Sequence, residues 1–336
     1  LCLNGHAIHA KGSTAAINLE DSWGFRFDLT DCGTDGKITG NINAWDSVDE
    51  ASGVIIGARA TFNFYNGSIC DNTLDSYQTG LKAGAVEANG TFNMYGGSIK
   101  NNQGTRWIGA ESYYVGGVLV TSSGVFNLYD GELSGNSSAH RDRASGTFNG
   151  GAVNVNGGKF NMYGGVIKNN TAGTSKALSN GGAVYVGSNG TFNMTGGEIT
   201  GNTAYGTETN GGGGVRVGSG CTFTMSGGTI SGNTTDGGGG GVHVYTRGTF
   251  NMRGDAVISG NTAAGSGGGV CVSESGTFTM EGGTIGGGTG NGNTASGRGG
   301  GGVNVYNGTF TMKNGTISGN SADDSKGGDG NGGGVY

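Results

Sequence analysis

One feature constrains the fold of this chain more than any other: a phenylalanine that returns at intervals of 27 to 34 residues. The series consists of Phe62, Phe92, Phe126, Phe160, Phe192, Phe223, Phe250, Phe278 and Phe310. Self-similarity with a period of about 20 to 50 residues is typical of solenoids, propellers and other repeat arrays. We therefore expect stacked copies of one short unit, in which each copy contacts only its neighbours.

The repeated unit is clearest in the segment GTFNMTGGEITGNTA, residues 190–204. Phe192 and Met194 alternate with polar residues, which indicates a strand with one buried face. A Gly-Gly pair then predicts a tight turn, because glycine adopts positive φ values at little cost. Ile199 lies in a second short strand, and Asn202 follows it at a predicted corner.

A third strand follows a loop of variable length in each unit. In GGAVYV, residues 181–186, Val184 and Val186 are predicted to point inward and Tyr185 outward. Three short strands in about 30 residues fit one coil of a parallel β-helix, whose strands pair about 4.8 Å apart along the axis. The absence of proline agrees, since every coil needs its N–H groups for pairing. The predicted fold class is all-β, a single right-handed parallel β-helix (solenoid) with three parallel sheets.

An asparagine marks the same corner of successive units, and counting these residues gives about eleven coils. They are Asn4, Asn41, Asn72, Asn102, Asn136, Asn170, Asn202, Asn233, Asn261, Asn293 and Asn320. Stacked side-chain amides can hydrogen-bond along the axis as an asparagine ladder. Residues 1–60 are predicted to form irregular N-terminal coils of the same β-helix, and residues 61–336 its regular repeats, in one continuous domain. Both ends of the sequence fall within a coil, which we interpret as a piece of a longer chain.

Composition and charge disfavour several classes of protein. Glycine supplies 80 of 336 residues, yet there is neither a Gly-X-Y period nor proline, so the chain is not collagen-like. The formal net charge of −6 weighs against nucleic acid or an anionic membrane as partner. No apolar run approaches about 18 residues, so we expect no membrane insertion. The acidic residues before position 60 lack the order of a calcium loop and are interpreted as solvated turns, so no metal is predicted.

The five cysteines cannot all pair with one another. Cys2, Cys32 and Cys70 fall in the first three predicted coils, where one bridge is possible. Cys221 and Cys271 are predicted to lie on different strands about two coils apart, too distant for a disulfide. The count therefore indicates no disulfide framework.

An enzyme of the β-helix type would place its chemistry on outward positions of one sheet. The outward residues of the valine strands are Glu87, Leu119, Asn154, Tyr185, Arg216, His243, Cys271 and Asn304. Glycosidic cleavage commonly uses two carboxylates about 5 to 10 Å apart, whereas this row holds one carboxylate, far from Arg216 and His243. We predict no catalytic residue and no cofactor, and interpret Arg216 and His243 as exposed decoration.

A row of outward threonines, as in some ice-binding solenoids, is a weaker alternative. The row consists of Thr61, Thr91, Thr191, Thr222, Thr249, Thr277 and Thr309. Threonine is a good residue for any exposed strand face, the coil length varies, and Tyr65, Tyr95 and Tyr163 follow the row.

Long loops between the corner asparagine and the next valine strand cluster in coils three to seven, and they carry aromatic and charged residues. Aromatic rings beside Arg and Asp suit either sugar stacking or a protein interface. The alternative is that the rings pack against the solenoid wall and cover it. The candidate binding residues are Tyr77, Trp107, Tyr113, Tyr114, His140, Arg141, Asp142, Arg143 and Tyr205.

The runs SGNT (231–234), GGV (240–242) and GGAV (181–184) resemble the repeats of bacterial surface proteins with a right-handed parallel β-helix. These include adhesin-like proteins of gut Firmicutes, and the repeats are similar to those of chlamydial polymorphic outer-membrane proteins. The resemblance implies a secreted or surface-displayed, non-catalytic adhesin or structural stalk. Its implied partner is a protein or glycan on a host or neighbouring cell. The wider pectate-lyase-like superfamily also contains polysaccharide lyases and hydrolases, so a polysaccharide-binding or polysaccharide-cleaving enzyme is the alternative.

Overall fold

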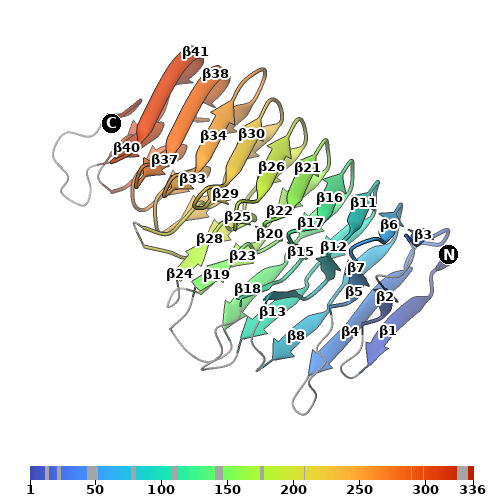
Figure 1. Cartoon of the computed structure of the whole chain (residues 1–336). Coiled ribbons are helices and arrows are strands. Elements are labelled where there is room, and N and C mark those ends of the chain that lie inside the picture. The colour runs from blue at the N-terminus through green and yellow to red at the C-terminus, as the bar shows by residue number, and fades with distance from the viewer. Residues whose placement is uncertain are drawn as a thin grey trace.

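The computed structural model describes residues 1–11, 15–20, 24–43, 52–76, 81–106, 113–140, 147–174, 178–207, 209–288, 290–297, 299–323 and 332–336. Within these residues the regular structure consists of β-strands β1 to β42, without a helix. Every strand pairing is parallel, and the coils stack in one direction from the N-terminus to the C-terminus (Figure 1). The predicted right-handed parallel β-helix is confirmed.

Each coil contributes a strand to the phenylalanine sheet, whose side chains alternate between the interior and the outside. This sheet consists of β3 (Arg26–Leu29), β6 (Thr61–Phe64), β11 (Thr91–Met94), β16 (Val125–Leu128), β21 (Lys159–Met162), β26 (Thr191–Met194), β30 (Thr222–Met225), β34 (Thr249–Met252) and the first halves of β38 (Thr277–Gly286) and β41 (Thr309–Ser318). Phe192 pairs in register with Phe160 and Phe223, and its ring centroid lies 4.6 Å from each of theirs.

A glycine turn leads from the phenylalanine sheet to the isoleucine sheet. The isoleucine sheet consists of β1 (Ala7–Lys11), β4 (Lys37–Asn43), β7 (Ser68–Cys70), β12 (Ser98–Lys100), β17 (Glu132–Ser134), β22 (Val166–Lys168), β27 (Glu198–Thr200), β31 (Thr229–Ser231), β35 (Val257–Ser259) and the second halves of β38 and β41. Gly197 makes this turn with a φ of +83°. A Cβ at Gly197 would lie 2.7 Å from the carbonyl oxygen of Gly164.

Beyond the corner asparagine lies a row of short strands that the sequence analysis did not predict. These corner strands are β8 (Thr73–Ser76), β13 (Gln103–Arg106), β18 (Ser137–His140), β23 (Thr171–Ala172), β28 (Thr203–Ala204), β32 (Thr234–Thr235), β36 (Thr262–Ala263), β39 (Thr294–Ala295) and β42 (Ser321–Ala322). The later ones hold only two residues each, too few to show an alternation in the sequence.

The valine sheet closes each coil and contains ten strands. They are β2 (Ile17–Leu19), β5 (Val54–Ile56), β10 (Val86–Ala88), β15 (Val118–Val120), β20 (Val153–Asn156), β25 (Val184–Gly187), β29 (Val215–Val217), β33 (Val242–Tyr245), β37 (Val270–Ser273) and β40 (Val303–Tyr306). The predicted number of about eleven coils is therefore slightly too high.

The outward positions of the valine sheet are not exposed, contrary to the expectation for this row. Leu119 packs against Ala83 and Val115, which belong to the outer strands that run over the sheet. These outer strands are β9 (Leu81–Ala83), β14 (Tyr113–Val115), β19 (Thr147–Asn149) and β24 (Leu178–Asn180). In the later coils, glycine-rich backbone covers the valine sheet in place of the outer strands. A Cβ on Gly238 would lie 3.0 Å from the sulfur of Cys271. The glycine runs thus allow backbone to lie directly on the sheet.

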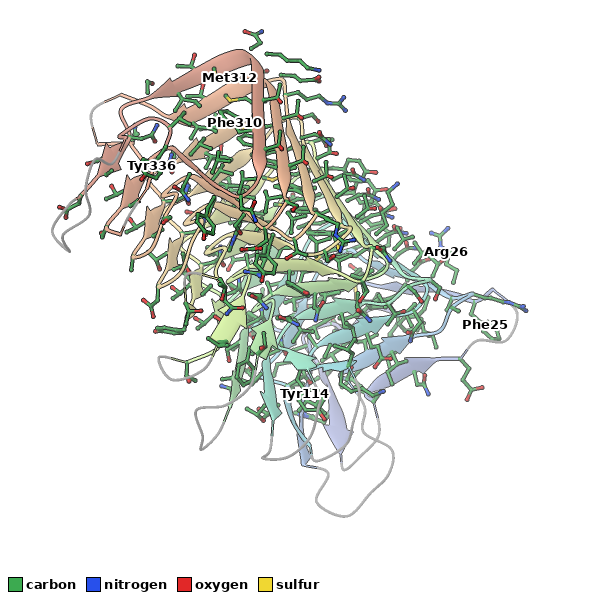
Figure 2. The ribbon with its side chains drawn as sticks, turned by 60° about the vertical axis from the view of Figure 1, so that its left-hand side comes forward. Phe25, Arg26, Tyr114, Phe310, Met312 and Tyr336 are labelled. Atoms are coloured by element: carbon green, nitrogen blue, oxygen red, sulfur yellow. A yellow bond between two sulfur atoms is a disulfide. The ribbon has the colours of Figure 1, made fainter. Side chains whose placement is uncertain are left out.

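The interior is filled by like residues stacked on like. The eleven residues Phe92, Met94, Ile99, Val118, Phe126, Leu128, Phe160, Met162, Ile199, Phe223 and Met225, for which the period-two pattern predicts burial, are all 0% exposed. At the C-terminal end the same positions have a neighbour on one side only (Figure 2). Met312, which pairs with the fully buried Met280, is accordingly 44% exposed.

A ladder of corner asparagines runs through the molecule from Asn72 to Asn320, as the sequence predicts for these residues. Asn4, which was counted as a corner as well, is exposed and lies outside the ladder. Each side-chain Nδ2 donates to the Oδ1 of the asparagine in the next coil at 2.8 to 3.0 Å. That Oδ1 also accepts the backbone N–H of the previous asparagine; Asn170 N lies 2.9 Å from Asn202 Oδ1. Asn202 Nδ2 in turn donates to the carbonyl oxygen of Ile167 at 3.0 Å. The amide thus satisfies polar backbone that the corner buries.

The N-terminal coil is held by one disulfide and one buried carboxylate. Cys2 and Cys32 form the disulfide, while Cys70, Cys221 and Cys271 are buried outside any disulfide. Asp31 accepts the N–H groups of Gly5 and Gly36 at 2.8 and 2.7 Å. These backbone hydrogen bonds, that of Gly5 foremost, lower the pKa of the Asp31 carboxyl.

We expect Phe192→Ala to lower the free energy of unfolding by about 3–5 kcal/mol, because two stacked neighbours hold the cavity open. Phe25→Ala is the control, since Phe25 is 53% exposed and should cost much less. Chemical denaturation followed by circular dichroism measures both. Equal decreases in the free energy of unfolding for the two variants would contradict the stabilising role of the phenylalanine stack.

Asn202→Asp tests the ladder, because it keeps the side-chain shape but replaces a donor by a buried charge. The carboxylate would face the carbonyl oxygen of Ile167 and the Oδ1 of Asn233, so we expect a loss of about 3 kcal/mol or more at pH 7. Burial raises the folded-state pKa of such a group above its unfolded value of about 3.9, so the loss should shrink as the pH falls toward that value.

The matched control is Asn193→Asp, in the partly exposed outer row of the phenylalanine sheet, where water can solvate the charge. Denaturation midpoints at pH 7 and at pH 4 compare the two variants. If Asn202→Asp is no less stable than Asn193→Asp at pH 7, the buried corner ladder does not have the stabilising role proposed for it.

Candidate functional site

The structure places the predicted loop residues in three groups. Tyr77, Trp107, Arg141, Asp142 and Arg143 lie outside the described residues. The backbones of Tyr113 and His140 belong to β14 and β18, where they pair with Leu81 and Arg106 of the preceding coil. Tyr114 and Tyr205 are described completely and differ in exposure. Of the described candidates, Tyr113 and Tyr114 are neighbours on β14, His140 ends β18, and Tyr205 follows β28.

Tyr114 is part of the wall rather than of an open surface. Its side chain is 1% exposed and packs against Leu74 and Ala16 (Figure 2). Gly104 allows this close approach, because a Cβ there would lie 2.8 Å from the Cβ of Tyr114. For this residue the packing alternative describes the structure, and the ring is not available to a partner.

The pair Arg216 and His243 is buried, which corrects its interpretation as exposed decoration. His243 is 0% and Arg216 4% exposed, because glycine-rich backbone covers the valine sheet here. Arg216 Nη1 lies 3.1 Å from His243 Nδ1, and His243 Nε2 lies 2.9 Å from Ser273 Oγ. The guanidinium also lies over the Tyr245 ring, 4.4 Å from its centroid.

Burial controls the charge of this pair. It lowers the pKa of His243 well below the ordinary value of histidine and lowers the pKa of Arg216 to about 10. The imidazole is thus neutral at neutral pH, and Nδ1 accepts from the guanidinium while Nε2–H donates to Ser273. Both ring nitrogens of His243 are hydrogen-bonded and shielded from solvent. The Arg216–His243 pair therefore stabilises the wall of the solenoid and is not accessible to a substrate.

The outer face of the phenylalanine sheet carries an exposed row of tyrosines. Tyr65, Tyr95, Tyr129 and Tyr163 stack with ring centroids 4.8 to 4.9 Å apart and are 39% to 47% exposed. The sequence analysis noted three of these tyrosines without assigning them to a surface. Tyr95 and Tyr129 are covered on both ring faces and present ring edges and hydroxyls to solvent, whereas Tyr65 and Tyr163 stack on one tyrosine each.

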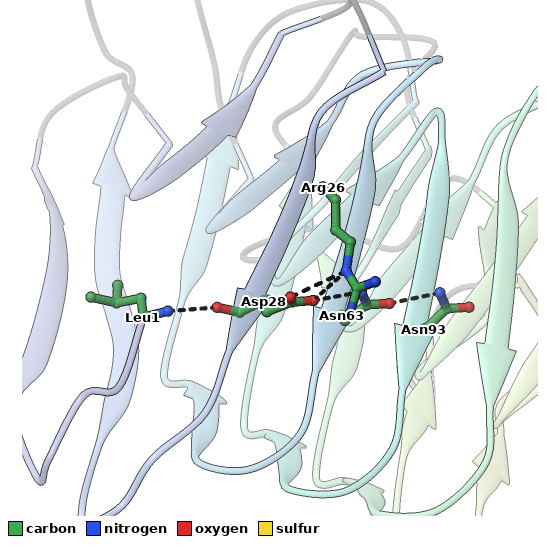
Figure 3. Close-up of polar contacts among 5 residues, drawn as sticks. All are labelled: Leu1, Arg26, Asp28, Asn63 and Asn93. Atoms are coloured by element: carbon green, nitrogen blue, oxygen red, sulfur yellow. Dashed lines mark hydrogen bonds and ion pairs between the residues drawn. The ribbon is translucent and has the colours of Figure 1, made fainter.

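Beside the tyrosines runs an outer asparagine row, from Asn63 to Asn193. Each Nδ2 donates to the Oδ1 of the preceding coil at 2.8 to 3.0 Å. Figure 3 shows how the row begins: Asn63 donates to Asp28 Oδ1 at 2.6 Å, and Arg26 Nε donates to the same oxygen at 3.0 Å. Hydrogen bonds from Arg26 and then from Asn63 lower the pKa of Asp28.

A groove of about 310 Å³ lies over the corner strands β28, β32 and β36. Its lining residues are Thr203, Thr234, Thr235, Asp236, Thr262, Ala264 and Ser296. The sequence pattern did not predict it, because the candidate binding residues were sought in the long loops of coils three to seven. The signal that was available is the threonine that follows most of the corner asparagines, which places hydroxyls on one outer face. Among the described residues, no group of three or more His, Cys, Asp or Glu side chains is arranged to hold a metal ion.

The fold and these surfaces define a parallel β-solenoid repeat protein whose outer rows carry hydroxyls, amides and tyrosine rings. Comparison of the chain with protein-family models, curated proteins and solved structures gave no match. Function must therefore be argued from the residues themselves.

We expect Tyr114→Ala to destabilise the protein by about 3 kcal/mol, because the ring fills a buried space beside Leu74. Tyr163→Ala is the matched control: its ring is 47% exposed and stacks on one neighbour, so it should cost about 1 kcal/mol. Urea denaturation of both variants measures the difference. A Tyr114 variant as stable as the Tyr163 variant would contradict its placement in the wall.

Proposed function

We propose that this chain is a secreted or surface-displayed β-solenoid that acts, without catalysis, as an adhesin or structural stalk. The observation that carries the proposal is the unbroken corner ladder, in which Asn72 to Asn320 join successive coils by hydrogen bonds of 2.8 to 3.0 Å. A rod braced in this way holds its two ends at a fixed distance and presents rigid rows of side chains. Its partner would be a protein or glycan on a host or neighbouring cell.

The extracellular location is supported by the Cys2–Cys32 disulfide, because disulfides persist mainly in oxidising compartments. In the described part of the chain, no helix has the length and apolarity needed to span a bilayer. The proposal concerns these residues alone and assigns no anchor.

Cleavage of a polysaccharide is the alternative, and the carboxylates of the groove and of the valine row are not arranged for it. Asp236 and Asp323 occupy one row of the corner strands, where each donates its N–H to the preceding coil. Three coils separate them, which corresponds to about 14 Å at the strand spacing. Glycosidases place their two carboxyl groups about 5 to 10 Å apart. Glu87, the carboxylate of the valine row, is 9% exposed beneath the outer strands and forms an ion pair with Lys82.

A turnover assay tests the non-catalytic proposal. We expect the purified protein, incubated with plant and mucin polysaccharides, to release no more reducing ends or unsaturated uronates than a heat-denatured sample. Beads coated with the protein should nevertheless attach to mucin or epithelial surfaces more strongly than beads coated with albumin. Product release above the heat-denatured control would overturn the proposal in favour of a polysaccharide-cleaving enzyme. If protein-coated beads attach no more strongly than albumin-coated beads, the result favours the structural stalk over the adhesin.

A further inference from the structure

The groove over the corner strands is built from two rows of equivalent positions. The first row holds the outward threonines Thr203, Thr234 and Thr262, which pair in register from coil to coil. The second row lies two residues further along each coil and consists of Tyr205, Asp236, Ala264, Ser296 and Asp323. The register of this row is fixed by backbone hydrogen bonds, since each residue donates its N–H to the preceding coil at 2.8 to 3.3 Å.

The lining of the groove is rich in hydroxyl groups and contains one carboxylate. Thr203 and Thr234 hydrogen-bond to each other through their hydroxyls at 3.2 Å, while Thr234 and Asp236 are exposed. Asp236 makes no ion pair with any described residue, so its oxygens face solvent. Ala264, the smallest member of the second row, lies between Asp236 and Ser296 and leaves room above it.

From this arrangement we infer that the groove binds a neutral polysaccharide chain. Hydroxyls both donate and accept, so a threonine row can hydrogen-bond sugar hydroxyls in either orientation. The Asp236 carboxylate adds acceptors for sugar hydroxyls, and hydrogen bonds to a charged group are the stronger kind. Tyr205 is half-buried and occupies the position of Asp236 in the preceding coil, next to the groove but outside its lining residues. The inference rests on the proposed role as an extracellular binding scaffold and names its ligand class.

Other ligand classes fit the lining less well. The Asp236 carboxylate and the net charge of −6 repel uronic acids and nucleic acids. Peptide interfaces draw most of their energy from apolar or aromatic anchors seated in pockets, and this groove offers methyl groups and hydroxyls instead. A single carboxylate is also too few ligands for a divalent cation.

The positions of the groove are rigid before any ligand arrives. Thr234 and Asp236 stand on backbone that is hydrogen-bonded to the preceding coil, and Asn233 beside them belongs to the buried corner ladder. Binding therefore orders little protein, which favours affinity for a ligand that makes only polar contacts. An extended chain running along the axis would meet the same hydroxyl at every coil from Thr203 to Thr262.

The test uses neutral xylo-, manno- and gluco-oligosaccharides as probes, with oligogalacturonate as the anionic comparison. Binding is measured by calorimetry and by the methyl resonance of Ala264, assigned through its loss in Ala264→Ser. We expect at least one neutral oligosaccharide to bind and to shift the Ala264 methyl. Asp236→Asn should weaken that binding about tenfold or more, since it removes charge from the acceptor, and Thr234→Val with Thr262→Val should weaken it further.

The matched controls are Asp255→Asn and Thr249→Val, which change the same residue types outside the groove and should bind as the unmodified protein does. All variants are compared by thermal melting, so that loss of fold is not mistaken for loss of binding. Failure of every neutral probe to bind the folded protein would overturn the inference. It is equally overturned if binding survives the groove substitutions, if oligogalacturonate binds more tightly, or if only a peptide or protein binds.

Failure of the groove and failure of the proposed function give different results. Cleavage products in the same samples would contradict the non-catalytic role, whatever the groove variants do. If the protein neither binds the oligosaccharides nor cleaves them, only the assignment of the groove is contradicted. The attachment experiment then decides between adhesin and stalk.

Discussion

The corner hydrogen bond is the constraint on which the rest of this solenoid depends. Where each coil bends, the chain buries peptide groups that neither sheet can pair, and the asparagine side chain supplies the missing donor and acceptor. Asn202 does both, by donating to Ile167 and by accepting from the backbone of Asn170. Because this bond fixes the corner, coils of different length can stack in register, and most of the variation falls in loops that leave after the corner.

The two asparagine ladders run in opposite directions along the axis. In the corner ladder Asn72 donates toward the C-terminus, to Asn102, whereas in the outer row Asn93 donates toward the N-terminus, to Asn63. Their amide dipoles therefore oppose each other over the coils that contain both. The outer row ends at Asp28, whose carboxylate is the natural acceptor for the last amide, and Arg26 balances its charge. The outer asparagine row is thus terminated by a charged pair that the repeat itself does not contain.

Glycine determines which surfaces this scaffold can offer. Backbone without side chains lies directly on the valine sheet and hides a row that includes Arg216 and His243, whose polar groups then satisfy one another. Among the remaining faces, the phenylalanine sheet carries the tyrosine and asparagine rows, and the corner strands carry the hydroxyl groove. Neither face carries paired carboxylates among the described residues, and both repeat at the strand spacing. Such surfaces suit ligands that are themselves extended and repetitive.

The sequence by itself determined the coil, because period-two alternation and the spacing of Phe192, Ile199 and Asn202 are local patterns that recur and reinforce one another. It identified the buried core and the corner ladder for the same reason. Only the tertiary structure decided what covers each outward face, since that depends on the path of loops whose lengths vary. Tyr114, chosen from sequence as a candidate contact, is buried because Gly104 admits its ring. The groove beside Asp236 forms because neighbouring coils place short strands side by side, which no single repeat reveals.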